Sequence, residues 1–185
     1  MIDVLQEAPD TVILAEDEAG LYLQATLSRV WAPQGQTPSV RSDPNRAKTN
    51  FYGSLNLHTG QEIAMSAPSM NADYTAQHLQ QILAAIPDRP LLLLWDRAPW
   101  HRGPPIRQVL ADNPRLEVML FPVAAPELNP QEQVWKATRQ AVSHNHLEPR
   151  LPELSNQFED HLTSTTFESS FLDRYGYTAL CPMFN

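Results

Sequence analysis

Three acidic side chains, far apart in the sequence, have the chemistry to act together. Asp17 and Asp96 each close an apolar run, and Glu132 lies just inside a predicted helix. Carboxylates packed together raise one another's pKa values unless a divalent cation neutralises them. Mg²⁺ prefers such oxygen ligands, and two ions about 3.5–4 Å apart can activate a water or 3′-hydroxyl and stabilise the leaving oxygen. The three acids therefore point to metal-dependent phosphodiester chemistry.

The elements that must position these acids follow from the hydrophobic pattern. Short apolar segments predict strands over residues 11–15, 51–57, 61–66, 91–95 and 116–121. Helical spacing predicts helices over about 71–86, 105–111 and 129–143, and a last one through Leu151, Leu154, Phe158 and Leu162. Asn71 or Asp73 is the expected cap of the first helix. This order predicts the α/β class, with a mixed sheet and helices on its faces.

Asp17 has two acidic neighbours that compete with it for the role of ligand. If the strand continues through residues 16–18, alternation places Asp17 on the face opposite Glu16 and Glu18. Asp17 is favoured because Ala15, which shares its face, belongs to the apolar run. The alternative is that the three acids form a solvated strand end.

Asp96 follows five bulky apolar residues and precedes a segment with little reason to be buried. It would lie at the carboxyl end of a parallel strand, where ligands of such sheets gather. Its alternative roles are a helix cap or an ion pair with Arg97 or Arg102. Five residues later, His101 could contact phosphate or brace the site, and a packing role in a loop is the alternative.

Glu132 also has two alternative roles. Asn129 and Glu132 have the spacing of a capping box, in which the glutamate folds back onto the N-cap amide. Glu132 could also pair with Lys136, four residues further along the helix. The functional interpretation instead places Glu132, Lys136 and Arg139 on a helix face that looks across a cleft toward a phosphate backbone.

Composition limits the class of protein. The 185 residues suit one well-buried domain. A net charge of −8 argues against a general nucleic-acid binder, although residues 29–50 and 89–107 each carry a positive balance. The single cysteine, Cys181, excludes an internal disulfide framework and a cysteine-based zinc site. No apolar run reaches the roughly 20 residues of a membrane span, and no signal-peptide pattern is present, so we expect a cytoplasmic protein.

Four segments together make the chain similar to a known family. Residues 15–18 read Ala-Glu-Asp-Glu, and residues 29–38 read Arg-Val-Trp-Ala-Pro-Gln-Gly-Gln-Thr-Pro. Residues 96–101 read Asp-Arg-Ala-Pro-Trp-His, and residues 126–136 read Pro-Glu-Leu-Asn-Pro-Gln-Glu-Gln-Val-Trp-Lys. Through these segments the chain, over roughly residues 11–145, resembles the catalytic domain of DDE transposases. The resemblance is to the mariner-like superfamily, which includes many bacterial insertion sequences.

The resemblance implies an RNase H-like fold, with a mixed five-stranded sheet and helices on both faces. It also implies two Mg²⁺ or Mn²⁺ ions, and cleavage and joining of DNA at the ends of insertion sequences. Asp17, Asp96 and Glu132 would be the catalytic residues and the metal ligands. The accessory or DNA-contact candidates are His101, Asn129, Lys136, Arg139, Arg29, Trp31 and Lys48.

The expected organisation is a single domain over residues 1–185, with a core of about 11–145 and a C-terminal helical segment of about 146–176. The family's N-terminal helix-turn-helix region, which reads the element ends, is absent. That absence suggests a split-gene product, a truncated copy or an excised domain. The expected partners are DNA, a second copy in a homodimer on DNA, and a separate N-terminal DNA-binding polypeptide, in a bacterial, nucleoid-associated setting.

Two positions depart from the family pattern. Arg97 stands where the family has asparagine beside the second acid, and Ala124-Ala125 stand where it often has Tyr-Ser. Two other functions remain as alternatives to an active transposase. One is a catalytically silent remnant with only interaction capacity, and the other is an RNase H-like nuclease that acts on hybrids or junctions.

Overall fold

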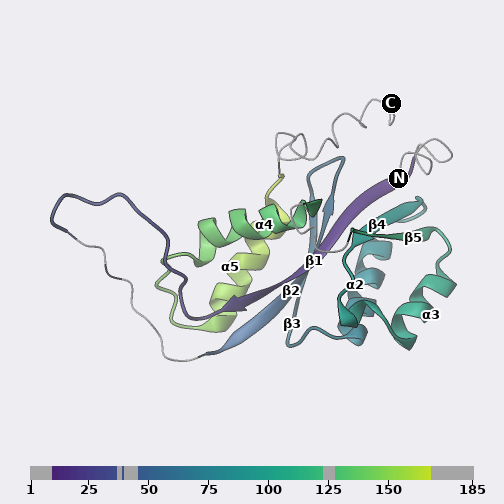
Figure 1. Cartoon of the computed structure of the whole chain (residues 1–185), viewed down its shortest axis with the longest axis horizontal. Helices are drawn as coiled ribbons and strands as arrows, with labels where there is room; N and C mark the ends of the chain where they lie inside the picture. Colours follow the sequence, from purple (N-terminus) through teal and green to yellow (C-terminus); the bar gives the residue numbers. More distant parts are fainter. Residues whose placement is uncertain (1–9, 37–38, 40–45, 123–127, 168–185) are drawn as a thin grey trace.

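The chain folds around one five-stranded mixed sheet, of strand order β3-β2-β1-β4-β5 (Figure 1). The computed structural model describes residues 10–36, 39, 46–122 and 128–167. β1 pairs antiparallel with β2 and parallel with β4, while β3 and β5 form the two edges. The strands are β1 (Val12–Tyr22), β2 (Lys48–Asn56), β3 (Glu62–Ala67), β4 (Leu91–Trp95) and β5 (Leu116–Leu120). The predicted mixed sheet is therefore confirmed.

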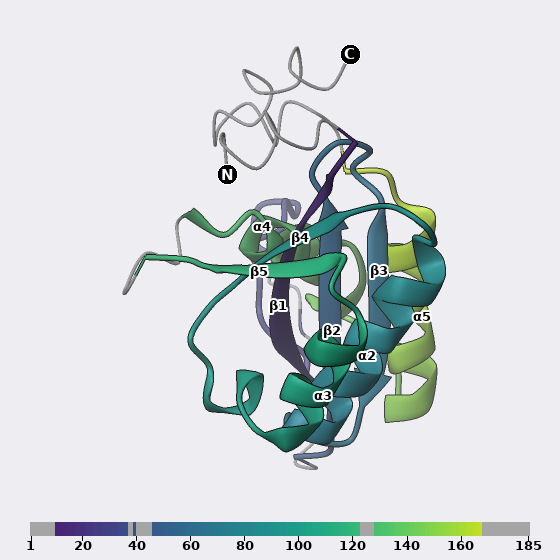
Figure 2. The same ribbon diagram turned by 90° about the vertical axis from the view of Figure 1, so that its right-hand side faces the viewer.

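Helices cover both faces of the sheet, because each face buries its own apolar core. One core contains side chains of α2 (Ala72–Ala85) and α3 (Pro104–Asp112), which lie on the viewer's side of the sheet in Figure 2. The other contains side chains of α4 (Gln131–Thr138) and α5 (Leu151–Ser164). We call these the α2 face and the α4 face.

β4 is the clearest example of this two-sided burial. All five of its residues are buried, as its continuous apolar run predicts. Leu93 and Trp95 belong to the core of the α2 face, and Leu92 and Leu94 belong to the core of the α4 face. A strand covered on both faces holds its carboxyl end in a fixed place, and Asp96 follows directly.

β1 is longer than predicted, and this corrects the interpretation of its acids. The strand continues to Tyr22 because it pairs with β2 along its length, with Asp17 opposite Gly53. Glu16, Asp17 and Glu18 therefore lie inside a central strand, and Glu16 is only 1% exposed. The alternative of a solvated strand end is wrong.

The helices follow the prediction with smaller differences. Asn71 caps α2, and its Oδ1 accepts from the backbone N–H groups of Asp73 and Tyr74, so the alternative cap Asp73 is wrong. A short 3₁₀ helix, Pro99–His101, was not predicted. The predicted helix 129–143 is divided into α4 and a π-helical turn, Arg139–Ser143.

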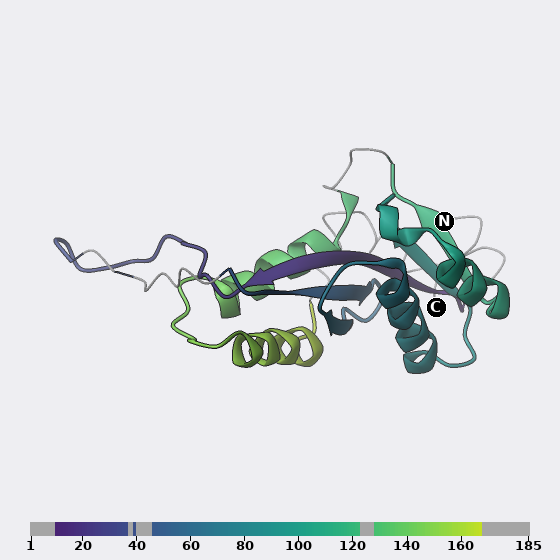
Figure 3. The same ribbon diagram turned by 90° about the horizontal axis from the view of Figure 1, so that it is seen from below.

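Residues 23–36 contain no helix and run out from the end of β1, away from the sheet (Figures 1 and 3). None of the helices in the described ranges combines the length and the apolar character that a bilayer crossing requires. The predicted C-terminal helical segment contains α5, and its part after residue 167 lies outside the described residues.

Candidate active site

Strand alternation divides the three acids of β1 between the two faces of the sheet. Asp17 shares the α4 face with Ala15 and Ala19, which belong to that core. Glu16 and Glu18 point to the opposite side, where both contact the ring of His101. Two groups of polar side chains thus lie back to back across one strand.

Asp17 is half-buried, and its electrostatic surroundings are acidic. Burial raises the pKa of Asp17 to about 7, a backbone hydrogen bond from Glu18 opposes the rise, and the charges of Glu132, Glu18 and Asp96 add to it. The carboxylates of Glu132 and Asp96 therefore repel the charge of Asp17. A divalent cation among these oxygens would relieve that repulsion.

Asp96 is held through a single oxygen. Its Oδ1 accepts from the backbone N–H of Ala98 at 2.7 Å and lies 3.1 Å from Nδ1 of His101. The side chain remains 55% exposed. The predicted role of Asp96 as an N-cap is wrong, because the N-cap of the 3₁₀ helix is Ala98 and the Asp96 carboxylate accepts from the N–H of Ala98 itself. The predicted ion pairs with Arg97 or Arg102 do not form among the described residues.

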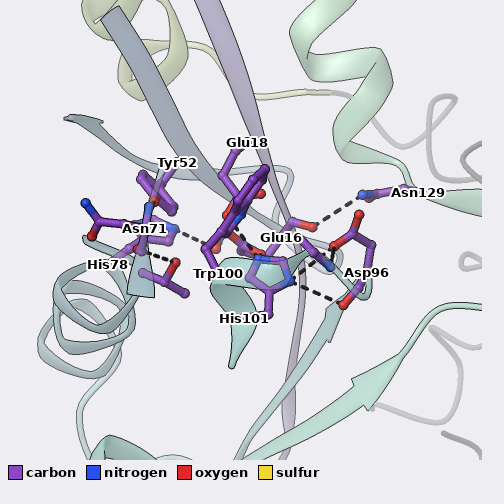
Figure 4. Close-up of polar contacts among 12 residues, drawn as sticks. Glu16, Glu18, Tyr52, Asn71, His78, Asp96, Trp100, His101 and Asn129 are labelled. Carbon is purple, nitrogen blue, oxygen red and sulfur yellow. Dashed lines mark hydrogen bonds and ion pairs between the residues drawn. The ribbon is translucent and has the colours of Figure 1, made fainter. Parts of the chain in front are cut away.

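Glu132 is exposed in the first turn of α4, whose start is fixed to β1 by Asn129. Asn129 is buried, donates from Nδ2 to the backbone oxygen of Glu16 at 3.3 Å, and accepts at Oδ1 from the N–H of Gln131 (Figure 4). Within the described chain, the Glu132 side chain makes neither the capping-box contact nor an ion pair with Lys136. Both alternative roles for Glu132 are therefore wrong.

A buried polar pair that the sequence did not reveal supports α4 on the same face. Gln131 Nε2 donates to Oε1 of Glu62 at 2.5 Å. Burial raises the pKa of Glu62 well above its usual value, although the hydrogen bond from Gln131 opposes the rise. A Cβ at Gly53 would collide with Gln131, Glu62 and Trp135. The glycine within an apolar strand was the available signal, since it marks a close approach.

On the α2 face, one side of the His101 ring lies against the carboxyl groups of Glu16 and Glu18 (Figure 4). Its Nε2 is 3.0 Å from Oε1 of Glu18 and 3.3 Å from Oε2 of Glu16. The ring stacks on Trp95 with centroids 4.3 Å apart, and Trp100 Nε1 donates to Glu18 at 2.5 Å. The sequence indicated His101 but neither glutamate nor Trp100 as its contact, because strand alternation gives the face on which a residue lies and not its partner.

Among the described residues, one group of possible metal ligands has all its ligand atoms within 4.8 Å of one another. Its members are Glu16, Glu18 and His101. Burial alone would lower the pKa of His101, but hydrogen bonds and charges of both glutamates outweigh it and raise this pKa to about 11. Burial, with the charge of Glu18, raises the pKa of Glu16 to about 8, although His101 opposes the rise. At neutral pH a protonated His101 therefore already supplies the positive charge that this group needs.

The other accessory candidates lie apart from these two groups. Arg29 and Trp31 are on the extended segment 23–36, where Trp31 is fully exposed. Lys48 begins β2 and pairs with Tyr22 at the far end of β1. The structure does not bring these three residues to the acids.

Arg139 and Lys136 remain beside Glu132 along the same helical segment. Lys136 is exposed on α4, and Arg139 follows in the π-helical turn. Arg139 lines a cavity of about 300 Å³ together with Gly20, Leu21, Tyr22, Gln24, Thr26 and Ser143. Ala124-Ala125 and the start of the motif at 126–136 lie outside the described residues.

Two bacterial proteins are similar to the chain in sequence. The "Insertion element IS630 uncharacterized 39 kDa protein" of Shigella sonnei is 24% identical over 135 residues, which cover 72% of this chain and 39% of that protein. The "Uncharacterized protein y4pE/y4sA" of Sinorhizobium fredii (strain NBRC 101917 / NGR234) is 29% identical over 90 residues, 48% of this chain and 64% of that protein. The chain therefore spans less than two thirds of both relatives.

Solved structures of Mos1 share the fold. The mariner Mos1 paired end complex with Mg superposes with a TM-score of 0.67 at 17% identity, over 92% of this chain and 54% of that chain. The catalytic domain of Mos1 mariner transposase gives a TM-score of 0.56 at 15% identity, over 93% and 78%. The predicted RNase H-like fold is confirmed. A family model described as "DDE superfamily endonuclease" matches residues 12–155, most of the chain, and the chain therefore belongs to this family.

Proposed function

We propose that this chain is the catalytic domain of a DDE transposase, which cleaves and joins DNA at the ends of an insertion element. Asp17, Asp96 and Glu132 would be its metal ligands, holding two Mg²⁺ or Mn²⁺ ions. The observation that carries the proposal is electrostatic: the charges of Glu132 and Asp96 both raise the pKa of Asp17. The carboxylates of Asp17, Asp96 and Glu132 come from separate parts of the fold and together form a hard-oxygen donor set that suits these ions.

Exposure favours this trio over the group around His101. A phosphodiester must reach the ions, and both Asp96 and Glu132 are exposed. The side chains of Glu16, Glu18 and His101 are no more than 3% exposed. A protonated His101 also occupies the place where a cation would bind between the two glutamates.

Each acid of the trio is carried by an element with its own support. Asp17 lies in the central strand, and Asp96 is fixed at Oδ1 by the backbone of the 3₁₀ turn. Glu132 is on α4, whose start Asn129 ties to β1. Divalent ions, when bound, would lower the pKa of the attacking water or 3′-hydroxyl and stabilise the leaving oxygen. Lys136 would bind the phosphate backbone beside the site.

The structural relatives support a DNA substrate and divalent ions. They include a Mos1 paired-end complex with the left transposon end, a Mos1 strand transfer complex, and Mos1 paired end complexes with Mg and with Mn. The net charge of −8 is opposite to the basic footprint of a DNA-binding domain. We propose that recognition of the element ends comes from a separate N-terminal DNA-binding polypeptide, within a homodimer on DNA.

The proposal is tested by Mn²⁺-dependent nicking of duplex DNA with wild type, Asp96→Asn and Asp160→Asn. Asp160 is an exposed acid of α5 and serves as the matched control. We expect Asp96→Asn to lose nicking by at least about 100-fold, whereas Asp160→Asn keeps it. Equal nicking by Asp96→Asn would identify a contaminating nuclease and end the proposal. A preference for RNA–DNA hybrid over duplex DNA would instead support a hybrid nuclease.

A further inference from the structure

His101 connects the two groups of acids at the carboxyl end of β4. Its Nδ1 lies 3.1 Å from Asp96 Oδ1 and 3.2 Å from the backbone oxygen of Asp96. Its Nε2 lies against Glu18 and Glu16. The ring thus has a candidate metal ligand on one side and two buried glutamates on the other (Figure 4).

We infer that Glu18 and His101 form a brace that orients Asp96 for metal binding, with His101 acting as a positioning residue and not as a ligand or a DNA contact. The inference rests on the proposed function, since it takes Asp96 as a metal ligand. It assigns a role to Glu18, which lies on the other side of β1 from the proposed site.

The hydrogen-bond partners show that both ring nitrogens of His101 act as donors in the brace. Nδ1 faces a carboxylate and a carbonyl oxygen of Asp96, so it must donate a proton to hold them. Nε2 faces carboxyl oxygens of Glu18 and Glu16, so it donates as well. Both donations fix the ring, and the stacked Trp95 restricts its rotation.

The contacts also explain why an exposed aspartate needs the brace. Asp96 lies just after β4 and keeps 55% of its side chain in solvent, where a carboxylate samples several rotamers. Ala98 and His101 both bind Oδ1, which leaves the second oxygen for an ion. In other proteins, the loss of a residue that forms a hydrogen bond to a metal ligand lowers the metal affinity by about 10–100-fold.

Glu18 is itself held, which makes it a fixed anchor. Trp100 donates to its Oε1, and the 3₁₀ turn that carries Trp100 is closed by the hydrogen bond from His101 N–H to the Ala98 oxygen. Glu18, Trp100, His101 and Asp96 therefore form one connected set of contacts between β1 and the end of β4.

The test is calorimetric Mn²⁺ affinity, measured without DNA, for two substitutions of His101. In His101→Asn the amide N–H can replace Nδ1 and keep the bond to Asp96, whereas in His101→Gln the longer amide replaces Nε2 and loses Asp96. We expect His101→Gln to bind Mn²⁺ about 10–100-fold more weakly, and His101→Asn to lose less than about tenfold. If His101 only filled space in the core, His101→Asn would not bind Mn²⁺ more tightly than His101→Gln.

His78→Gln is the matched control, because His78 is also a buried histidine of the α2 face, with hydrogen bonds to Ser54 and Gln81. It should lose thermal stability and keep its Mn²⁺ affinity. If His101→Gln fails to fold, Glu18→Gln replaces it, with an expected weakening of about tenfold. Mn²⁺ affinity within threefold of wild type in the folded variant overturns the brace.

The failure of the proposed function gives a different result. If wild type shows no saturable Mn²⁺ binding, or Asp96→Asn binds as tightly as wild type, Asp96 is not a ligand and both claims fall. The second outcome is also the one expected if the ion bound between Glu16, Glu18 and His101. If Asp96→Asn loses binding while His101→Gln keeps it, the proposed function stands and only the brace is wrong.

Discussion

At the scale of single residues, one strand gives adjacent acids different surroundings. Asp17 is half-buried beside other acidic groups, and burial with their charges raises its pKa to about 7. Glu18, the next residue, accepts hydrogen bonds from Trp100 and His101 on the opposite face. Asp17 and Glu18 are neighbours in the sequence but lie on opposite faces of β1, so neither can take over the contacts of the other.

Asp17→Asn should stabilise the metal-free protein. A folded-state pKa above the ordinary 3.8 means that the fold favours the neutral carboxyl group, so this stability is present below pH 3.8 and is lost as the pH rises through about 7. At pH 8 the neutral asparagine should gain on the order of 1–2 kcal/mol, or about 2–8 °C in Tm.

The measurement is thermal unfolding at pH 5 and pH 8, with and without Mn²⁺. The gain should be larger at pH 8 than at pH 5, and Mn²⁺ should raise the Tm of wild type but not of Asp17→Asn. A lower Tm for Asp17→Asn at pH 8 would show that the ionised carboxylate is not strained in the fold.

In the candidate site, the sequence indicated which residues could act together but not which side chains they contact. Asp96 could be predicted from the apolar run before it, and β4 has the predicted bounds. The contacts between Glu18 and His101, and between Glu62 and Gln131, join residues far apart in the chain. Such pairs depend on tertiary packing, which periodicity along one strand or helix does not encode.

At the scale of elements, α4 can pack closely against β2 only because β2 has a glycine at the point of contact. Gly53 lies opposite Asp17 in the ladder, and an added Cβ would meet Gln131, Glu62 and Trp135. The sequence predicted the strand and the helix separately. It also underestimated β1, because pairing with β2 extends a strand past its apolar run.

Gly53→Ala should therefore disturb α4 and the acid that it carries. Overpacking of this kind costs about 1–3 kcal/mol. We expect a Tm lower by about 2–10 °C and a weaker Mn²⁺ affinity, because Glu132 moves with the helix. Gly20→Ala is the control, since its Cβ would meet only the Tyr22 ring at 3.4 Å. Equal Tm values for the two variants would show that α4 does not rest on Gly53.

At the scale of the whole molecule, buried titratable groups change the stability of the fold in opposite directions as the pH changes. Burial raises the pKa of Glu16 and of Asp17, so their ionisation weakens the fold as the pH rises. Burial lowers the pKa of His78 to about 4, although a hydrogen bond with Gln81 opposes the fall. The ionisation of Glu16 and Asp17 and the protonation of His78 therefore change the stability of the fold in opposite directions over the same pH range.

Among these groups, His78 is the one that weakens the fold as the pH falls, and it joins α2 to two strands. Its Nε2 is 2.9 Å from Ser54 Oγ on β2, and Gln81 extends the contact to the Ala64 oxygen on β3. The folded-state pKa lies below the ordinary 6.5, so the fold favours the neutral ring. This stability is present above pH 6.5 and is lost as the pH falls toward 4.

The difference in unfolding free energy between wild type and His78→Gln isolates this effect, because the other titrating groups cancel. From pH 7.5 to pH 5, we expect wild type to lose about 2 kcal/mol relative to His78→Gln. Urea unfolding of both proteins at the two pH values measures it. Parallel losses would show that the pKa of the His78 ring is the same in the folded and the unfolded protein, in which case the acid limit of the molecule does not lie with His78.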